Sequence, residues 1–358
     1  MLAALVLGCG SDGGDQATTD GTDPSTSAGG PTTATTVGTT ISTSGLDTES
    51  PSTGGDPTTV STTVSTTEAD SSSSSMGGST FDLGVQPDVG VVEGCTAVDF
   101  LFVIDDSSSM ETHQANLIAN FPAFIDGIEK SLGSVESYQV GVVATDPFSG
   151  NPGACILIGA LVTSTTGAGA SSSQAECGPY ADGFNFMTDA DDLDASFACA
   201  AQVGTSGSGS ERPMDAVVAA VDGSLGEAGG CNEGFVRDDA LLVVVVITDE
   251  YDGPGDPEPG NGEEPATSMG GPMDWYDAVV AAKGGIVENA VALAIVNYEG
   301  GACAPAELGF DGVNIVSWAE LFGVNGFVGG LCEQDYGPMF AEATGVIAQA
   351  CANFVPQG

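Results

Sequence analysis

Three acidic residues, Asp105, Asp146 and Asp249, each stand within two positions of the end of an apolar run. Ser107 and Ser109 follow Asp105 at alternate positions and add two hydroxyl groups. Hard divalent cations prefer oxygen ligands, and Mg²⁺ keeps several waters in an octahedral shell. A carboxylate and two hydroxyls on one tight loop therefore predict part of a cation site, whose open position a partner's acidic group could occupy.

The segments that must position these residues alternate between strand-like and helix-like patterns. Buried β-branched runs of strand length are typical of parallel sheets, because both faces of such strands are covered. Strands that alternate with helices predict a doubly wound, mostly parallel α/β sheet flanked by helices. Such sheets bind ligands beyond the carboxyl ends of their strands, where the three acids are expected. The expected strands are 98–104, 138–144, 156–162, 241–247 and 291–296, and the expected helices are 111–131 (with a start or a kink at Pro122), 191–201, 212–222, 274–283, 315–322 and 342–354.

The motif Asp105-x-Ser107-x-Ser109 after an apolar strand resembles the metal-ion-dependent adhesion site of von Willebrand factor A domains. The resemblance spans residues 95–354. It implies the Rossmann-like fold of that family, a resident Mg²⁺ (or Mn²⁺ or Ca²⁺), and a role in adhesion rather than in catalysis. The later Thr-Asp-Glu motif, at 248–250, resembles that of cysteine-rich lipoproteins of this family from predatory soil and marine bacteria, the myxobacterial type.

The family's site also takes a Thr from a second loop and an Asp after a later strand. Asp249, in the segment Val-Ile-Thr-Asp, matches that Asp. The second loop corresponds to the Gly- and Ser-rich stretch before the third expected helix. Spacing to that helix favours Ser210 as the hydroxyl ligand, with Thr205 and Ser208 as alternatives. Asp146 and Thr205 are candidates for supporting the ligands from behind.

Other interpretations of the same residues stay open. Asp105 and Asp249 could cap helices, and Ser107 and Ser109 could be turn residues. Because no Thr in the second loop clearly matches the family's Thr ligand, the domain could be a structural scaffold with a degenerate metal site. A hydrolase with a carboxylate pair around a metal is a third possibility. Against catalysis, His113 is the one His of the chain and no Gly-x-Ser-x-Gly elbow occurs.

Charge limits the range of partners. The 358-residue chain has 4 Lys and Arg against 50 Asp and Glu, a formal net charge of −46 at pH 7. A chain this acidic has no patch to neutralise phosphates, which argues against nucleic acids and against charge-driven attachment to anionic lipids. We expect a monomer that binds a protein or glycan ligand through an acidic group. The acidic loop 252–264 is either a solvated loop or a Ca²⁺ site.

The beginning of the sequence resembles a lipoprotein leader. Residues 5–9, Leu-Val-Leu-Gly-Cys, are similar to the lipobox of bacterial lipoproteins, in which cleavage precedes a Cys that then carries the lipid. A charged start and a longer apolar core are missing, so we interpret 1–8 as a truncated signal peptide and Cys9 as the lipid carrier. Ser, Thr, Gly, Asp and Pro dominate much of 9–94, which predicts a disordered tether. The domain 95–358 would then be lipid-anchored in the cell envelope, at the outer membrane, in the periplasm or at the cell surface.

The cysteines indicate an oxidising compartment. With Cys9 set aside, eight remain in the predicted domain, an even number that favours disulfides. A single His and the absence of Cys-x-x-Cys argue against zinc. Many pairings are possible, and neighbours in the sequence are plausible partners. The expected pairs are Cys155 with Cys177, Cys199 with Cys231, Cys303 with Cys332, and Cys95 with Cys351 across the ends of the domain.

Overall fold

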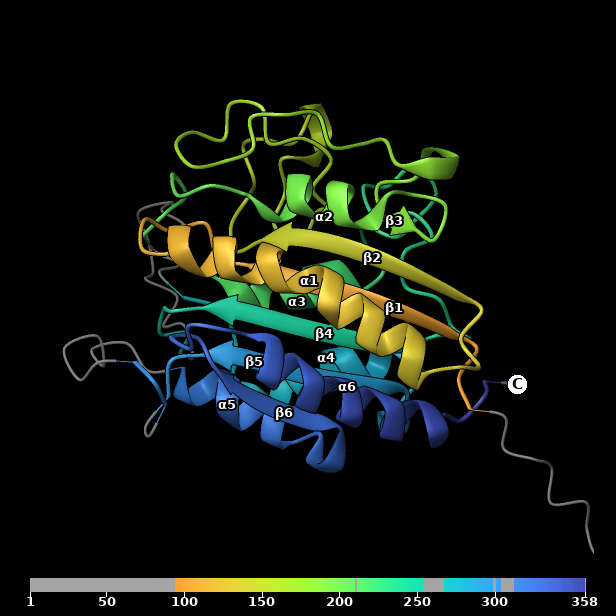
Figure 1. Ribbon diagram of the computed structural model, residues 1–358. Coiled ribbons are helices and arrows are strands. Elements are labelled where there is room, and N and C mark those ends of the chain that lie inside the picture. The colour runs from red at the N-terminus through yellow and green to blue at the C-terminus, as the bar shows by residue number, and fades with distance from the viewer. Residues whose placement is uncertain (1–93, 210, 254–266, 299–300, 304–311, 358) are drawn as a thin grey trace, which may run out of the picture. The chain divides into compact units, whose positions relative to one another are not determined.

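One six-stranded sheet forms the centre of the folded domain (Figure 1). The computed structural model describes residues 94–209, 211–253, 267–298, 301–303 and 312–357. The strands follow the order β3-β2-β1-β4-β5-β6, with β3 antiparallel to β2 and all other neighbours parallel. This confirms the predicted mostly parallel α/β sheet flanked by helices. The strands are β1 (Ala97–Ile104), β2 (Ser137–Ala144), β3 (Met187–Thr188), β4 (Leu241–Thr248), β5 (Ala290–Val296) and β6 (Gly326–Gly330).

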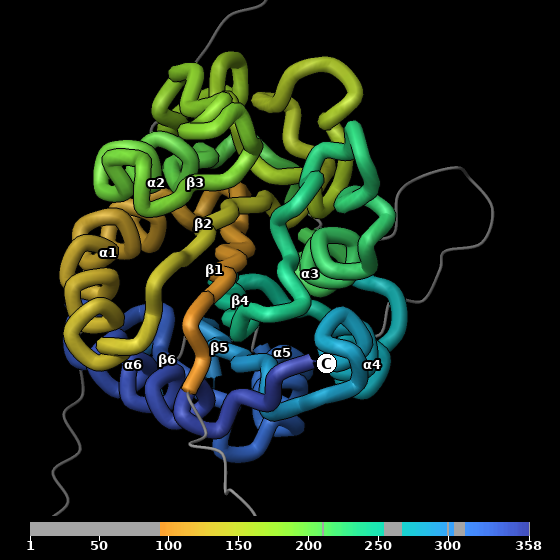
Figure 2. The backbone as a smooth tube through the Cα atoms, turned by 90° about the vertical axis from the view of Figure 1, so that its right-hand side faces the viewer, coloured from red at the N-terminus to blue at the C-terminus, as the bar shows by residue number. Residues whose placement is uncertain are grey.

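Helices cover both faces of this sheet (Figure 2). Alternate residues of a strand point to opposite faces. In β1, Phe100 and Phe102 therefore pack in one core with α1, α2 and α6, while Leu101 and Val103 pack in the other with α3, α4 and α5. Among the described helices, none is long and apolar enough to cross a membrane. The helices are α1 (Glu111–Ser131), α2 (Leu193–Ala201), α3 (Pro213–Val221), α4 (Pro272–Ala282), α5 (Val313–Glu320) and α6 (Gly337–Ala352).

The three central strands end level with one another. Ile104, at the end of β1, is in register with Ala144 of β2 on one side and with Ile247 of β4 on the other. The chain moves outward in opposite directions from β1 and β4, which makes the gap between their carboxyl ends the switch point of the sheet, where α/β folds bind ligands. The residues that follow these strands therefore meet at one edge, as predicted.

The structure differs from the expected elements in four places. Residues 156–162 form a loop rather than a strand, and the side chains of Asn151 and Asn232 bond its backbone groups. The short antiparallel edge strand is β3, within the stretch expected as loop. The sequence of β6, Gly-Phe-Val-Gly-Gly, has weak strand propensity and was not predicted. Helix α1 runs through Pro122 without beginning there.

Four disulfides are present, and two of the expected pairs are wrong. Cys95–Cys351 and Cys303–Cys332 form as predicted. The remaining four cysteines pair as Cys155–Cys231 and Cys177–Cys199. These pairs differ from the prediction because of the loop after β2. Asn232, in the segment before β4, forms hydrogen bonds with the backbone of this loop. The Cα atoms of Cys155 and Cys231 are therefore 5.7 Å apart. Disulfides of this number are typical of proteins outside the reducing cytosol.

A buried ionic group holds the opposite, amino edge of the sheet. Asp99 of β1 is fully buried and pairs with Arg237, whose Nη2 lies 2.6 Å from its carboxylate. Burial raises the pKa of Asp99 to about 6, although Arg237 acts to lower it. Lys283, also fully buried, donates to the carbonyl oxygen of Arg237. Two of the chain's four basic side chains, those of Arg237 and Lys283, are thus bound at the amino edge of the sheet, far from its carboxyl edge.

Candidate metal centre

The loop that follows β1 carries the first group of predicted ligands. Asp105 is fully buried. One of its carboxylate oxygens accepts a hydrogen bond from the backbone N–H of Ser107 at 2.7 Å, and the other accepts one from the hydroxyl of Thr248 at 2.5 Å. The hydroxyl oxygens of Ser107 and Ser109 lie 3.2 Å apart. The carboxylate and the two serine hydroxyls therefore gather at one point of the sheet edge.

Asp249 joins this group from the neighbouring strand. It follows β4, which pairs directly with β1, and its charge acts to raise the pKa of Asp105. The Oδ1 atom of Asp249 is buried and has no hydrogen-bond partner. A buried carboxylate oxygen without a partner is costly. The oxygen set of Asp105, Ser107, Ser109 and Asp249 fits a hard divalent cation, which would satisfy that oxygen.

The loop before α3 was expected to supply a hydroxyl ligand, and that prediction is tested only in part. Ser210, the favoured fourth ligand, lies outside the described residues. Thr205 points its hydroxyl at the carbonyl oxygen of Ala170, 3.4 Å away. The backbone N–H of Ser208 donates to Asp146 at 2.8 Å. The residue that the loop brings to the centre is Glu211, which sequence reasoning missed.

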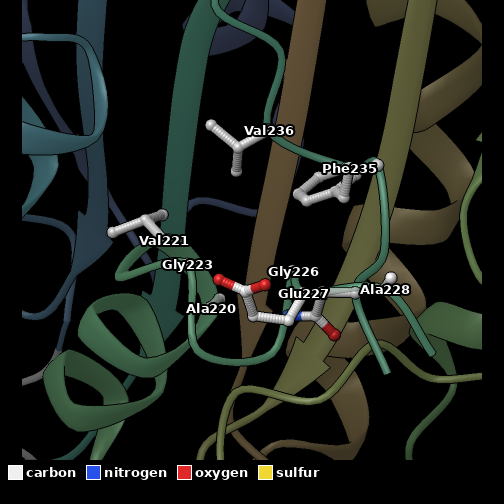
Figure 3. A pocket seen from close by; sticks show the side chains of 10 residues that line it. Ala220, Val221, Gly223, Gly226, Glu227, Ala228, Phe235 and Val236 are labelled. Atoms are coloured by element: carbon white, nitrogen blue, oxygen red, sulfur yellow. The ribbon is translucent and has the colours of Figure 1, made fainter. Parts of the chain in front are cut away.

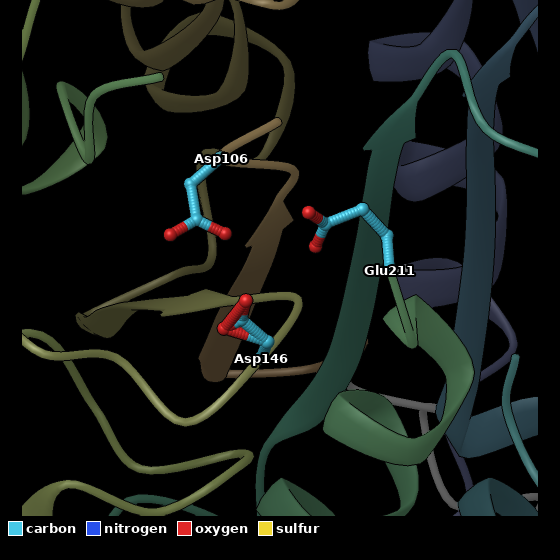
Figure 4. Close-up of side chains that lie close together, drawn as sticks. All are labelled: Asp106, Asp146 and Glu211. Carbon is cyan, nitrogen blue, oxygen red and sulfur yellow. The ribbon is translucent and has the colours of Figure 1, made fainter. Parts of the chain in front are cut away.

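Glu211 forms an acidic triad with Asp106 and Asp146 (Figure 4). One carboxylate oxygen from each residue lies within 4.8 Å of the other two, an arrangement that could hold a metal ion. Asp106 and Glu211 are only 4% and 2% exposed, whereas Asp146 is half-buried. The hydroxyl of Thr145 donates to Glu211 and lies 3.4 Å from Asp106. Asp146, expected behind the ligands, thus belongs to a cluster of its own.

The charges of these carboxylates are unfavourable in the absence of a cation. Burial, together with the Asp249 charge, raises the pKa of Asp105 to about 7, although hydrogen bonds from Thr248 and Ser107 lower it. Burial and the nearby acids Asp146 and Asp105 raise the pKa of Asp106 to about 8. Burial, followed by the charges of Asp105 and Asp106, raises the pKa of Glu211 to about 10. Burial also raises the pKa of Asp146. The centre therefore attracts either protons or metal ions.

Gln114, near the start of α1, fixes the two loops relative to each other. It is buried, and its side-chain nitrogen donates to the carbonyl oxygens of Asp105 at 2.8 Å and Gly204 at 2.7 Å. Its side-chain oxygen accepts a hydrogen bond from the N–H of Gly204. One side chain thus joins the loop after β1 to the loop before α3, which positions the ligands of both.

Gly207 allows the second loop to approach the first closely. Its N–H donates to the carbonyl oxygen of Asp106 at 2.9 Å. A Cβ atom at position 207 would lie 2.5 Å from Cγ of Asp106, too close for any side chain. A glycine at position 207 is therefore needed for the carboxylate of Asp106 to sit against this loop.

The acidic segment after β4 begins with a structural residue. Asp252 is fully buried and accepts hydrogen bonds from the N–H and the hydroxyl of Ser268 and from the N–H of Met214, in the first turn of α3. It ties this segment to the helix that follows Glu211. The rest of the predicted acidic loop, 254–264, lies outside the described residues, so neither a solvated loop nor a Ca²⁺ site is tested there.

A separate cavity of about 280 Å³ lies at the other end of α3 (Figure 3). Its lining includes Ala220, Val221 and Phe235, and Glu227 is the one charged side chain among its lining residues. The backbone N–H of Arg212, just before α3, bonds the loop after β2, so α3 begins beside the metal centre and ends at this cavity. With a single charge and no converging polar groups, the cavity lacks the features of a specific site.

Comparisons with known proteins give only remote similarities. No protein-family model and no curated protein matches the chain. Similar solved structures include proximal thread matrix protein 1 from the mussel byssus, with 12% identity and a TM-score of 0.36 over 72% of this chain and 49% of that one. The D319A mutant of the PilB minor pilin from Streptococcus sanguinis has 13% identity and a TM-score of 0.36 over 72% of this chain and 63% of that one. The pilus adhesin SpaC from Lactobacillus rhamnosus GG, in an open conformation, has 12% identity and a TM-score of 0.34 over 72% of this chain and 30% of that one. The chain spans less than two thirds of each of these structures, and similarity at this level carries no argument about what it binds.

Proposed function

We propose that the domain is an extracytoplasmic binding module that engages a protein or glycan ligand through a divalent cation held by Asp105, Ser107, Ser109 and Asp249. The observation that carries the proposal is the buried, unpartnered Oδ1 atom of Asp249, an acid whose charge acts on Asp105 at the same edge of the sheet. Mg²⁺, Mn²⁺ and Ca²⁺ all take such oxygen ligands. The bound cation would supply a positive point at which an acidic group of the ligand could bind.

The binding role is proposed in preference to a catalytic one because the centre faces the carboxyl edge of the sheet with carboxylates and hydroxyls alone. His113 lies on α1, in its first turn, and makes no hydrogen bond with the predicted ligands. The hydroxyls of Thr145 and Thr248 donate to Glu211 and Asp105, so they serve to orient the carboxylates. A cluster of such oxygen atoms favours cation binding.

We also propose that Cys9 carries a lipid anchor. All eight cysteines from Cys95 onward are paired in four disulfides, which leaves Cys9 as the remaining cysteine of the nine. Its position after Leu-Val-Leu-Gly fits the lipobox pattern. Mass spectrometry of Cys9 peptides from native membranes tests this: a diacylglyceryl adduct is expected, and an unmodified thiol would refute the anchor.

Calorimetry with Mg²⁺, Mn²⁺ and Ca²⁺ tests the cation site. We expect saturable binding to the wild-type chain and at least a tenfold loss of affinity in Asp249→Asn, which keeps the shape of the side chain but removes its charge. Asp277→Asn, at an exposed position on α4, removes one charge elsewhere and should bind as the wild type does. Absence of saturable binding to the wild type would refute the proposal.

Ligand binding is tested next on arrays of acidic and neutral glycans and of acidic peptides. Binding to members with a carboxylate is expected with Mg²⁺ or Mn²⁺ and should disappear with EDTA and in Asp249→Asn. Equal binding with and without EDTA would exclude a role for the cation in recognition.

One observation favours an alternative, a structural domain in which the cation serves only the fold. Glu211 directly follows Ser210, the hydroxyl that the resemblance favours, and a third acid in the triad makes the centre less attractive to an acidic ligand. In that case EDTA would lower the melting temperature of the domain but leave no ligand binding to abolish. Both functions therefore predict saturable cation binding in the calorimetry, but only the binding module predicts cation-dependent ligand binding on the arrays.

A further inference from the structure

The carboxyl edge carries two groups of ligands on opposite sides of β1. Asp105 lies toward β4, where it accepts a hydrogen bond from the hydroxyl of Thr248. Asp106 lies toward β2, within reach of Thr145 and Asp146. The triad of Asp106, Asp146 and Glu211 therefore adjoins the proposed cation site, and Asp105 is close enough for its charge to act on Glu211.

The hydrogen bonds of the triad leave one oxygen without a partner. The hydroxyl of Thr145 has a single proton, which it donates to one oxygen of Glu211. The other oxygen of Glu211, Oε1, is buried and accepts no hydrogen bond. Figure 4 shows the carboxylate of Glu211 turned toward that of Asp106. Two buried acids that face each other, with one oxygen of Glu211 left without a partner, offer oxygen ligands to a cation.

The charge of the whole centre leads to the same conclusion. Five carboxylates meet there, those of Asp105, Asp106, Asp146, Glu211 and Asp249. Of the four Lys and Arg in the chain, Arg212 alone lies close enough to act on one of these acids, and it also pairs with Asp215 at 3.7 Å.

The other three basic residues lie away from this centre. Lys130 pairs with Asp126 on the exposed face of α1, and Arg237 and Lys283 form contacts at the amino edge of the sheet. With all five carboxylates ionised, the full charge of Arg212 still leaves four negative charges, and Glu250, near Asp249, adds to them. One divalent cation offsets two of these charges, so a second cation can bind without making the centre positive.

We infer that Asp106, Asp146 and Glu211 bind a second divalent cation, so that the centre holds two. This inference rests on the proposed function for the first cation. It also bears on ligand choice, because a second cation adds two positive charges to the centre and so favours the binding of an acidic group.

The stoichiometry of Mn²⁺ tests the inference. The full chain is titrated with Mn²⁺ by calorimetry in ~150 mM salt, which screens loose binding to surface acids, and is then examined by electron paramagnetic resonance. We expect two Mn²⁺ per chain with spectra broadened by their mutual magnetic interaction. Asp146→Asn, whose side-chain oxygen can still accept from Ser208, should bind one Mn²⁺ and lose the broadening. Asp277→Asn on α4 is the matched control and should bind two.

Glu211→Gln provides a second variant, because it keeps the oxygen that accepts from Thr145, and it should also bind one Mn²⁺. Near-ultraviolet circular dichroism confirms the fold of each variant. One Mn²⁺ per wild-type chain, unchanged in Asp146→Asn, would overturn the second site and leave the proposed function standing. No saturable Mn²⁺ binding to any of the chains would overturn both.

Discussion

Cation binding to this centre should release protons and therefore strengthen as the pH rises. Two carboxylates 4.8 Å apart repel each other by about 3 kcal/mol at an effective dielectric constant of about 20. Three such pairs in the triad approach the entire stability of a typical domain, ~5–15 kcal/mol. Without a cation the centre must therefore be partly protonated, in agreement with the pKa values of about 8 for Asp106 and about 10 for Glu211.

Near pH 7, a cation would displace about two protons from these carboxylates. Each displaced proton makes the apparent affinity rise about tenfold per pH unit, or 1.36 kcal/mol, so that affinity rises about a hundredfold between pH 6 and pH 7. Calorimetry in two buffers with different ionisation enthalpies counts the protons directly. Glu211→Gln should release about one proton fewer, and Asp277→Asn the same number as the wild type. Affinity that is flat from pH 5 to pH 8, with no proton released, would refute this account of the centre.

Three further predictions follow from the same contacts. In EDTA, the pKa values of Asp106 and Glu211 are raised in the folded chain, so that above about pH 4 it binds more protons than the unfolded chain. Its melting temperature should therefore fall from pH 5 to pH 8. A rise over this range would contradict the raised pKa values of these two acids. Gln114→Ala leaves three buried backbone groups of two loops without partners and should lower the free energy of unfolding in urea by about 2–4 kcal/mol. A decrease below about 0.5 kcal/mol, as expected of surface sites, would show that the hydrogen bonds of Gln114 are unimportant for stability. Gly207→Ala places a Cβ atom against the carboxylate of Asp106 and should weaken Mn²⁺ binding, measured by calorimetry, with Gly209→Ala, where a Cβ meets nothing within 4 Å, as the control; equal affinities would disprove the need for close approach.

The sequence predicted the central sheet and its acidic edge because those features depend on local patterns. The runs of β1, β4 and β5 are apolar except for Asp99 and Thr248, and every residue of these strands is buried. Parallel strands of similar length place their carboxyl ends together, which brought Asp105 and Asp249 to the same edge by topology alone. Thr248, one residue before Asp249, could have been recognised as a partner for Asp105 by the same reasoning.

The parts that were missed depend on contacts between distant segments. Glu211 was missed because a hydroxyl ligand was sought in this loop, whereas Glu211, an acid just before a helix, completes the triad with Asp106 and Asp146. The pairing of Cys155 with Cys231 follows from loop packing that no sequence spacing records. Strand β6 has three glycines in five residues and forms because β5 offers a paired edge, rather than because of its own propensity.

Strand β1 connects the entry of the folded domain to its metal centre. The chain enters it at Ala97, two residues after the Cys95–Cys351 bond, and leaves it at Asp105. A pulling force between the preceding chain and a ligand held at the centre would therefore run along the length of β1. Because β1 pairs with β2 and β4 along its length, such a force loads its hydrogen bonds in shear, together rather than one after another. The disulfide links the entry of β1 to α6, so that part of such a load would pass into this helix.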